Sequence, residues 1–452
     1  MLKRKITDKI KDWYQNNDSA LLIDGARQIG KTTSVRTFFK EAKLDYAELN
    51  LLENRLALEA FNTSTDARQL MLRISALVGK ELKENKTIIF IDEIQEAADA
   101  ITPIKFLIQQ TQFRFVFSGS LLGIKIQSIL SMPVGFLTVH KMYPLDFEEF
   151  MMAFGISEKT ISYLNDCFLN KKIVDNIIHT QMMNLFHIYM VVGGMPKAVT
   201  TFLEYNDINK VNQVLYDIDN GYRNDVSKYE KESGQKLRIQ ELYDLIPNEL
   251  NAANKRFLLK DFNKKARFYQ LESSFIWLKN SGIGLFVHNV DNPVYPLLAS
   301  KERTLFKLFL CDIGLLSYKL CMGHQIDILN GNDVSNFGAL YEAIAAMELS
   351  SHGYELFYNN DKKRGEIDFL IEDGNKVIPV EIKSGKNYKR HSALSQLLSN
   401  PAFSYQEGYV FCNGNTERKG KMIYYPIYML MFLKRTAKKS TQKITFDISH
   451  LL

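Results

Sequence analysis

Residues 25–32 read GARQIGKT, which fits the phosphate-binding pattern GxxxxGK(S/T) at every fixed position. An apolar run, residues 21–23, precedes this segment, and a helical pattern over residues 34–43 follows it. The pattern requires a strand, a glycine-containing loop and a helix in this order, because backbone N–H groups and the helix N-terminus then surround the phosphates. The sequence therefore predicts a nucleotide site on a parallel α/β sheet.

The positions of this segment, called the P-loop below, have distinct expected roles. Gly25 and Gly30 allow the backbone to curl, Lys31 is expected to reach the β- and γ-phosphates of ATP, and Thr32 is expected to bind Mg²⁺. A turn with a chance lysine is the alternative, and the complete match argues against it. The residues expected to bind the nucleotide are Gly25, Ala26, Arg27, Gln28, Ile29, Gly30, Lys31, Thr32 and Thr33.

Two further apolar runs end in polar residues that suit phosphoryl chemistry. The run Ile88–Asp92 is followed by Glu93, and a continuous apolar run is typical of a buried parallel strand. Ligands gather at the carboxyl ends of such strands, so Asp92 is expected to bind Mg²⁺ and Glu93 to polarise the attacking water. The run 113–118 leads into Ser118-Gly119-Ser120, a tripeptide that is also common in turns. One of its two serines, of which Ser118 is the main candidate, is expected to orient the γ-phosphate or the water.

Residues 365–384 predict a β-hairpin whose two faces differ sharply. A two-residue loop at Gly374-Asn375 is a strong hairpin signal, and the register that it sets places Asp368 opposite Glu381. Glu366 then faces Lys383, while isoleucine, valine and phenylalanine fill the other face. Directly opposed carboxylates, with Cβ atoms ~4.5–5.5 Å apart, repel each other unless a cation such as Lys383 or a divalent metal lies between them.

The chain is long enough for several domains, and its pattern changes along the way. With 452 residues it exceeds one ordinary domain, and its net charge of +6 permits a nucleic-acid partner without demanding one. The order of short helices before the strand run Gly284–Val290 is typical of a winged helix. We expect an α/β multidomain chain with an ATPase core (1–152), a helical lid (153–235), a winged-helix-like domain (236–300) and an α/β domain (301–452).

These motifs resemble the AAA+ ATPases, and more narrowly a bacterial and archaeal family with a C-terminal domain of unknown function. That family combines the P-loop with an Asp-Glu strand, a PLxFEEF segment, here residues 143–150, and a GGMP element, here 193–196. The resemblance implies a parallel AAA+ sheet, ATP and Mg²⁺ as cofactors, and ATP hydrolysis. Many members carry a Gly-Arg pair before PLxFEEF, and residues 133–136 lack it. Arg223 is one candidate for an arginine finger, and a solvated helical charge is its other interpretation.

The C-terminal residues resemble the PD-(D/E)xK nuclease fold. In that fold an acid on a helix, here Glu342, precedes an Asp and a Glu-x-Lys pair, here Asp368, Glu381 and Lys383. The resemblance implies that the three acids bind a metal and that Lys383 assists the water that attacks a phosphodiester. Two alternatives stay open: a solvated hairpin with a cross-strand salt bridge, and a nuclease-like fold without activity.

Basic residues between 255 and 267 make DNA or RNA a candidate partner. They lie in the expected winged helix and suit phosphate contacts, although solvated helix faces are the alternative. The chain is thus either an ATP-driven enzyme acting on DNA or an ATP-dependent signalling switch with a catalytically silent interaction module; its oligomeric state stays open. The residues expected to contact DNA are Lys255, Arg256, Lys260, Lys264, Lys265 and Arg267.

Cysteine use and hydropathy bear on the cellular compartment. The four cysteines form no CxxC pair, which favours buried free thiols in a reducing compartment. The N-terminus has no apolar signal region, and the most apolar late stretch, residues 422–433, is too short for a membrane span and is expected to be core. We therefore expect a cytoplasmic protein.

Overall fold

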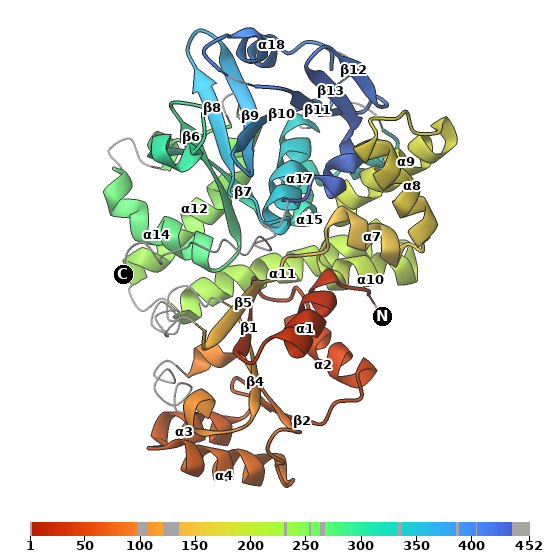
Figure 1. Ribbon diagram of the computed structural model, residues 1–452. Coiled ribbons are helices and arrows are strands. Elements are labelled where there is room, and N and C mark those ends of the chain that lie inside the picture. The colour runs from red at the N-terminus through yellow and green to blue at the C-terminus, as the bar shows by residue number, and fades with distance from the viewer. Residues whose placement is uncertain are drawn as a thin grey trace, which may run out of the picture.

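The computed structural model describes residues 2–97, 107–120, 135–229, 233–252, 255–262, 267–331, 337–385, 388–403 and 405–435. Figure 1 shows two sheets, one in the N-terminal part and one in the C-terminal part, with the long helix α11 (Ile208–Tyr229) crossing the middle of the molecule between them. Both sheets are covered by helices, so the α/β multidomain fold expected from the sequence is confirmed.

The N-terminal sheet has five parallel strands in the order β2-β3-β4-β1-β5. Every residue of β3 is buried, which explains its continuous apolar sequence. Strand β2 alternates buried and half-buried residues, β5 has only half-buried and exposed ones, and neither strand was predicted. Separate apolar cores fill its two faces, one under α1 and α2 and one under α3 and α4. The strands are β1 (Ala20–Asp24), β2 (Tyr46–Asn50), β3 (Ile88–Asp92), β4 (Arg114–Gly119) and β5 (Leu137–Lys141); the helices are α1 (Lys5–Asn16), α2 (Lys31–Glu41), α3 (Arg55–Thr63) and α4 (Ala67–Val78).

Helices follow the first sheet, as the sequence predicts for residues 150–235. Between α9 and α10 the chain turns at Gly193 and Gly194, where a Cβ atom on Gly194 would lie 2.1 Å from the carbonyl oxygen of Leu145. This close approach of two backbones requires glycine and fixes the turn against residues 142–146, called the segment after β5 below. The helices are α7 (Phe147–Ala153), α8 (Glu158–Leu169), α9 (Asn176–Val192), α10 (Pro196–Tyr205), α11 and α12 (Ser233–Asn251).

The second sheet is mixed and has eight strands in the order β12-β13-β11-β10-β9-β8-β6-β7. Strands β6 and β7 pair antiparallel, so the sheet continues across the boundary expected between residues 300 and 301. The strands are β6 (Gly284–Val290), β7 (Lys301–Leu310), β8 (Phe357–Asp361), β9 (Gly365–Asp373), β10 (Lys376–Ile382), β11 (Gly408–Cys412), β12 (Glu417–Lys419) and β13 (Met422–Pro426). The helices are α13 (Leu259–Phe262), α14 (Phe268–Asn280), α15 (Ile313–Cys321), α16 (Gln325–Leu329), α17 (Phe337–Ser351) and α18 (Ser392–Ser399).

Apolar packing joins the two halves of the molecule. One continuous core runs from the α1 and α2 face of the first sheet, through α9 and α15, to the α17 side of the second sheet. The stretch 422–433 is buried in this part of the fold as β13 and the short helix Ile427–Phe432. All four cysteines lie within the described residues, are buried and form no disulfide. Within the described residues, no helix combines the length and the apolar character that a membrane span requires.

Candidate functional site

The backbone of the P-loop takes conformations that favour glycine. A Cβ atom on Gly25 would lie 2.2 Å from the carbonyl oxygen of Met142, and Gly30 has φ +91° where α2 begins. Gln28, between them, also has a positive φ of 64°. The loop therefore curls at the carboxyl end of β1, as the sequence predicts, and leads into the N-terminus of α2.

Lys31 is buried within the curl of the loop. Its Nζ donates to the carbonyl oxygens of Gly25, at 3.0 Å, and Ala26, at 2.8 Å. Burial lowers the pKa of Lys31, and the carboxylates of Glu93, Asp24 and Asp92 act in the opposite direction. The ammonium group therefore sits among acceptors that compensate its burial in part.

Side chains from three other elements donate hydrogen bonds to the Asp92 carboxylate. The Thr32 hydroxyl donates to Asp92 Oδ2 at 2.9 Å, and Asn50 from β2 donates to the same oxygen at 3.2 Å. Ser118 from β4 donates to the other oxygen, Oδ1. Hydroxyl and carboxylate oxygens are the ligands that Mg²⁺ prefers, so the residues present fit that ion.

Glu93 lies just beyond β3 in a left-handed conformation, with φ 56° and ψ 44°. Gln95 donates a hydrogen bond to its carboxylate, and the Ser120 hydroxyl lies 3.5 Å from Glu93 Oε2. A positive φ is uncommon for a residue other than glycine and often marks a functional position. Of the two serines that the sequence places at the end of the third apolar run, Ser118 contacts Asp92 and Ser120 lies beside Glu93.

Helix α11 contacts the P-loop directly. Arg27 forms an ion pair with the buried Asp225, and the Tyr222 hydroxyl donates to the Arg27 carbonyl at 3.1 Å. Arg223, the candidate arginine finger, instead pairs with Asp219 and Asp244. Arg223 therefore forms one ion pair within α11 and one that joins α11 to α12.

A cleft of about 240 Å³ opens beside the P-loop. It lies between the P-loop, the segment after β5, the α14–β6 turn, and the end of α17 with the connection from α17 to β8. Gly282 in that turn has φ +74°, and a Cβ atom there would lie 3.0 Å from the backbone nitrogen of Ala26. Lys141, Lys279 and Lys301 line the cleft, so positive charge stands next to the loop expected to hold phosphates.

The C-terminal hairpin has the register predicted from the sequence. Five pairs run from Lys376 opposite Asp373 to Val380 opposite Phe369. The ladder stops there, and the Asp368 carboxylate accepts a hydrogen bond from the Ile382 N–H at 2.8 Å. Asp368 therefore fills a place that a backbone carbonyl would take in a continued ladder.

Lysines neutralise the helical acid of this region. Both carboxylate oxygens of Glu342 are paired, one with Lys255 and the other with Lys307 at 3.1 Å. Lys307 also lies 2.6 Å from Glu366, and its side chain has no exposed surface. Burial lowers the pKa of Lys307, but the Glu342 and Glu366 carboxylates more than offset this and raise it.

The remaining acids, Asp368 and Glu381, are buried close together. Burial and then the Glu342 carboxylate raise the pKa of Asp368 to about 6, while burial and then the Asp368 carboxylate raise that of Glu381 to about 8. Lys383 lies 2.6 Å from Glu381 Oε1, whereas Glu381 Oε2 is buried without a hydrogen-bond partner. Glu342, Asp368 and Glu381, called the acid cluster below, therefore lie in one region. They do not form a group in which one ligand atom from each lies within 4.8 Å of the others.

The residues expected to contact DNA fall into different environments. Lys255 is engaged with Glu342, Arg256 is half-buried, and Arg267 is exposed before α14. Lys264 and Lys265 lie outside the described residues, as does the side chain of Lys260. The structure therefore joins two residues that the sequence analysis placed in separate sites, Lys255 and Glu342.

Several residues of these sites were not found from the sequence. Lys307 interrupts the apolar run of β7, and a charge inside a buried strand is the signal that a partner must face it. Asn50 has no comparable signal because its partner lies on another strand, and Gln95 has none because its contact with Ser120 crosses to the end of β4.

Comparison with known proteins assigns part of the chain. Residues 17–151 match a family described as AAA domain, while residues 183–325 and 337–430 match two different domains of unknown function. No curated protein matches the sequence.

Solved structures with a similar arrangement share little sequence with this chain. The Walker-type ATPase PABY2304 of Pyrococcus abyssi is 13% identical, with 71% of this chain and 96% of that chain covered and a TM-score of 0.42. The Aeropyrum pernix ORC1 protein in complex with DNA is 11% identical, with 72% of this chain and 90% of that chain covered and a TM-score of 0.27. C. elegans PCH-2 is 14% identical, with 44% of this chain and 57% of that chain covered and a TM-score of 0.25. The domain match and the parallel sheet with its P-loop together show an AAA-type P-loop fold over residues 17–151.

Proposed function

We propose that this chain hydrolyses ATP at the P-loop and uses its nucleotide state to control the C-terminal sheet. The observation that carries the first part is the meeting of Lys31, Thr32 and Asp92 beside Glu93. When bound there, Mg²⁺ would be held by Thr32 and Asp92 and would neutralise developing phosphate charge.

The chain's own residues divide the remaining work. The Lys31 ammonium would exchange its bonds to the Gly25 and Ala26 carbonyls for the β- and γ-phosphates. Glu93, restrained by Gln95, would accept a proton from the attacking water. Ser118 would hold the Asp92 carboxylate in place and so act as a positioning residue.

Two substitutions separate binding from hydrolysis. Lys31→Ala should abolish phosphate release and weaken ATP binding, whereas Glu93→Gln should keep binding and stop release. Lys40→Ala, on the exposed end of α2, is the matched control. Unchanged turnover in Glu93→Gln would remove Glu93 from its role, and unchanged turnover in Lys31→Ala would refute the site.

The contact between Arg27 and α11 supports the proposed control of the C-terminal part. Arg27 lies inside the P-loop, and its partner Asp225 lies on a helix that packs against α12 and α15, which in turn contact β7. A phosphate that draws Arg27 away from Asp225 would change the position of α11 against these helices. Strand β7 carries Lys307, so the acid cluster lies at the end of this chain of contacts.

The acid cluster supports a second proposal, a metal-dependent nuclease acting on DNA. Its specific support is Glu381 Oε2, a buried carboxylate oxygen without a hydrogen-bond partner next to Asp368. Glu342 has no oxygen to offer while Lys255 and Lys307 hold it, so we assign the metal to Asp368 and Glu381. A divalent metal there would supply an activated water for phosphodiester hydrolysis, and Lys383 would remain beside the reacting group.

The ion pairs of Lys255 and Lys307 with Glu342 equally support a catalytically silent interaction module, because they occupy an acid that a nuclease would use. One experiment decides between the nuclease and the silent module. Plasmid is incubated with Mg²⁺ or Mn²⁺, with and without ATP, for wild type, Asp368→Ala and Lys383→Ala. Cleavage that both variants lose supports the nuclease; Lys389→Ala, an exposed lysine paired with Glu417, should behave as wild type. Intact plasmid under every condition leaves the ATPase proposal standing and excludes the nuclease.

A further inference from the structure

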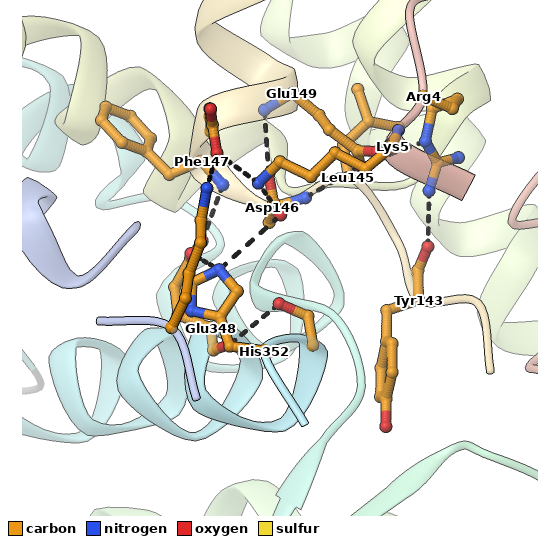
Figure 2. A network of polar contacts seen from close by, with 12 residues as sticks. Arg4, Lys5, Tyr143, Leu145, Asp146, Phe147, Glu149, Glu348 and His352 are labelled. Carbon is orange, nitrogen blue, oxygen red and sulfur yellow. Dashed lines mark hydrogen bonds and ion pairs between the residues drawn. The ribbon is translucent and has the colours of Figure 1, made fainter. Parts of the chain in front are cut away.

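Away from both sites, three potential metal ligands converge where the segment after β5 meets α17. Asp146 caps α7, while Glu348 and His352 lie one turn apart near the end of α17 (Figure 2). One ligand atom from each lies within 4.8 Å of the others, the only such group among the described residues. The side chains are 7%, 1% and 4% exposed, respectively.

The hydrogen bonding of His352 aims a lone pair into this group. Its Nδ1 lies 3.0 Å from the Leu433 carbonyl oxygen, which can only accept, so Nδ1 carries the hydrogen. Burial is the main reason that the pKa of His352 falls to about 4, which keeps the ring neutral. Nε2 is then an acceptor, and it points toward Glu348 Oε2 at 3.6 Å and Asp146 Oδ2 at 3.9 Å.

Two of these acceptor atoms have no hydrogen-bond partner. Glu348 Oε2 and His352 Nε2 are both buried and unpaired, while the other Glu348 oxygen accepts from the Phe147 N–H at 2.6 Å. The third atom, Asp146 Oδ2, accepts a hydrogen bond from Lys5 at 2.5 Å. The two unpartnered atoms repel each other, and a shared cation or proton removes that repulsion. The geometry therefore points to a ligand between them.

The surrounding charges leave room for such a cation. Lys5 pairs with Asp146 and Glu148, Lys434 pairs with Glu148, and Arg4 pairs with Glu149. Within the described residues, Glu348 pairs with no lysine or arginine. With Glu348 ionised, four carboxylates would face three cations and a neutral imidazole. Burial and then the Asp146 carboxylate raise the pKa of Glu348 to about 8, so either a proton on Glu348 or a bound cation supplies the missing charge at neutral pH.

We propose that Asp146, Glu348 and His352 bind one transition-metal ion of the Zn²⁺ class, which ties the ATPase domain to α17. A histidine that ligates a metal through one nitrogen usually donates its other N–H to a carbonyl or carboxylate, as His352 does to Leu433. Imidazole with carboxylates suits Zn²⁺ or Co²⁺, whereas Mg²⁺ prefers oxygen alone. Tetrahedral ligands at roughly 2.0–2.2 Å from Zn²⁺ stand about 3.4 Å apart. The two carboxylate oxygens lie 3.6 and 3.9 Å from His352 Nε2, close to that separation.

The site has an entry path and an open coordination position. A cleft of about 300 Å³ reaches Asp146 and His352 from between α1 and the end of α17. Three protein ligands leave the fourth position of a tetrahedral metal for water. The metal would also link two segments about 200 residues apart in sequence, which the hydrogen bond from the Phe147 N–H to Glu348 already joins.

Cobalt uptake by the full-length chain tests the proposal. Chelator-treated protein without nucleotide, kept in excess Mg²⁺ to saturate the all-oxygen sites, is titrated with Co²⁺ and followed by visible absorption and metal analysis. We expect one Co²⁺ per chain, displaced by Zn²⁺, and a Zn²⁺-dependent rise in Tm. His352→Ala and Glu348→Gln should each weaken uptake at least roughly 100-fold, because loss of second-shell contacts alone costs about 10–100-fold.

Two further variants identify the site. Asp368→Ala should keep the Co²⁺ signal, which separates this site from the acid cluster, and His324→Ala removes an exposed histidine that lies 3.6 Å from Asp327 and should change nothing. Circular dichroism checks that the variants fold, and Glu348→Gln preserves side-chain shape if His352→Ala does not fold. A wild-type chain that takes up no Co²⁺, or equal uptake in wild type, His352→Ala and Glu348→Gln, would overturn the proposal.

Discussion

Replacing Lys307 with methionine removes a buried charge while keeping the length of the side chain. In the folded chain Lys307 has no exposed surface and contacts Glu342 at 3.1 Å and Glu366 at 2.6 Å. Methionine leaves the buried Glu342 and the half-buried Glu366, which is 24% exposed, without this cation. Removing one partner of a buried ion pair typically costs about 3–5 kcal/mol, because the remaining charge keeps its desolvation penalty.

The remaining contacts decide where in this range the cost lies. Glu342 keeps Lys255, and Glu366 keeps a hydrogen bond from Asn360 at 2.7 Å. The loss should therefore stay within about 3–5 kcal/mol rather than double, although two carboxylates are affected. For domains of this size, with roughly 2–4 °C of Tm per kcal/mol, we expect a Tm lower by roughly 6–20 °C.

Chemical and thermal unfolding of three variants test this reasoning. Lys301→Met, the same substitution on the same strand at a lysine that pairs with the exposed Glu355, should cost less than about 1 kcal/mol. In Lys307→Met/Glu342→Gln one orphaned charge is also removed, so the two changes should couple by about 0.5–3 kcal/mol. If Lys307→Met costs no more than Lys301→Met, the buried pairs do not hold this part of the fold together.

Three other changes have definite expected outcomes. Gly25→Ala should abolish ATP binding in a fluorescence titration, because its Cβ would lie 2.2 Å from the Met142 carbonyl oxygen; near-normal affinity would contradict the described loop. Burial, followed by Lys301 and Lys279, lowers the pKa of His288 to about 4. The unfolded chain therefore binds a proton that the folded chain does not, and wild type should lose stability as pH falls from about 6.5 toward 4. His288→Phe should lose less stability over the same pH range. Arg256→Ala with Arg267→Ala should reduce the log–log salt slope of duplex DNA binding by up to about 0.9 per lost phosphate contact, and an unchanged slope would exclude both residues from the interface.

Local signals in the sequence were enough for the P-loop and for the hairpin. The fixed positions of the P-loop lie within eight residues, and the two-residue loop at Gly374-Asn375 sets a register that five observed pairs confirm. A one-residue slip would move every side chain of the hairpin to the other face, so the register is strongly specified. The place where that register fails, at Asp368, follows from a side-chain hydrogen bond that spacing does not reveal.

Contacts between distant segments could not be predicted in this way. Lys307 belongs to β7, which the sequence analysis assigned to a different domain from the preceding strand β6, and only the shared sheet brings it to Glu342. Asp146 is similar: as part of the PLxFEEF segment it was grouped with the ATPase motifs, yet it lies against α17, about 200 residues later. Pairing partners of single charges depend on the packing of whole elements, which one sequence without a fold does not fix.

The segment after β5 is the physical link between the proposed nucleotide site and the C-terminal part. Arg4 donates to the Ile29 carbonyl of the P-loop at 2.8 Å and to the Tyr143 carbonyl at 2.6 Å, so the P-loop and this segment share one buried cation. Three residues beyond Tyr143, Asp146 faces His352 of α17. A rearrangement of the P-loop on nucleotide binding would therefore act on α17 through two successive contacts, and a metal at Asp146 would stiffen the second of them. If this is how the two halves communicate, Zn²⁺ should change ATP turnover in wild type and leave it unchanged in Glu348→Gln, whose substitution lies far from the P-loop in sequence and touches none of the residues proposed for hydrolysis.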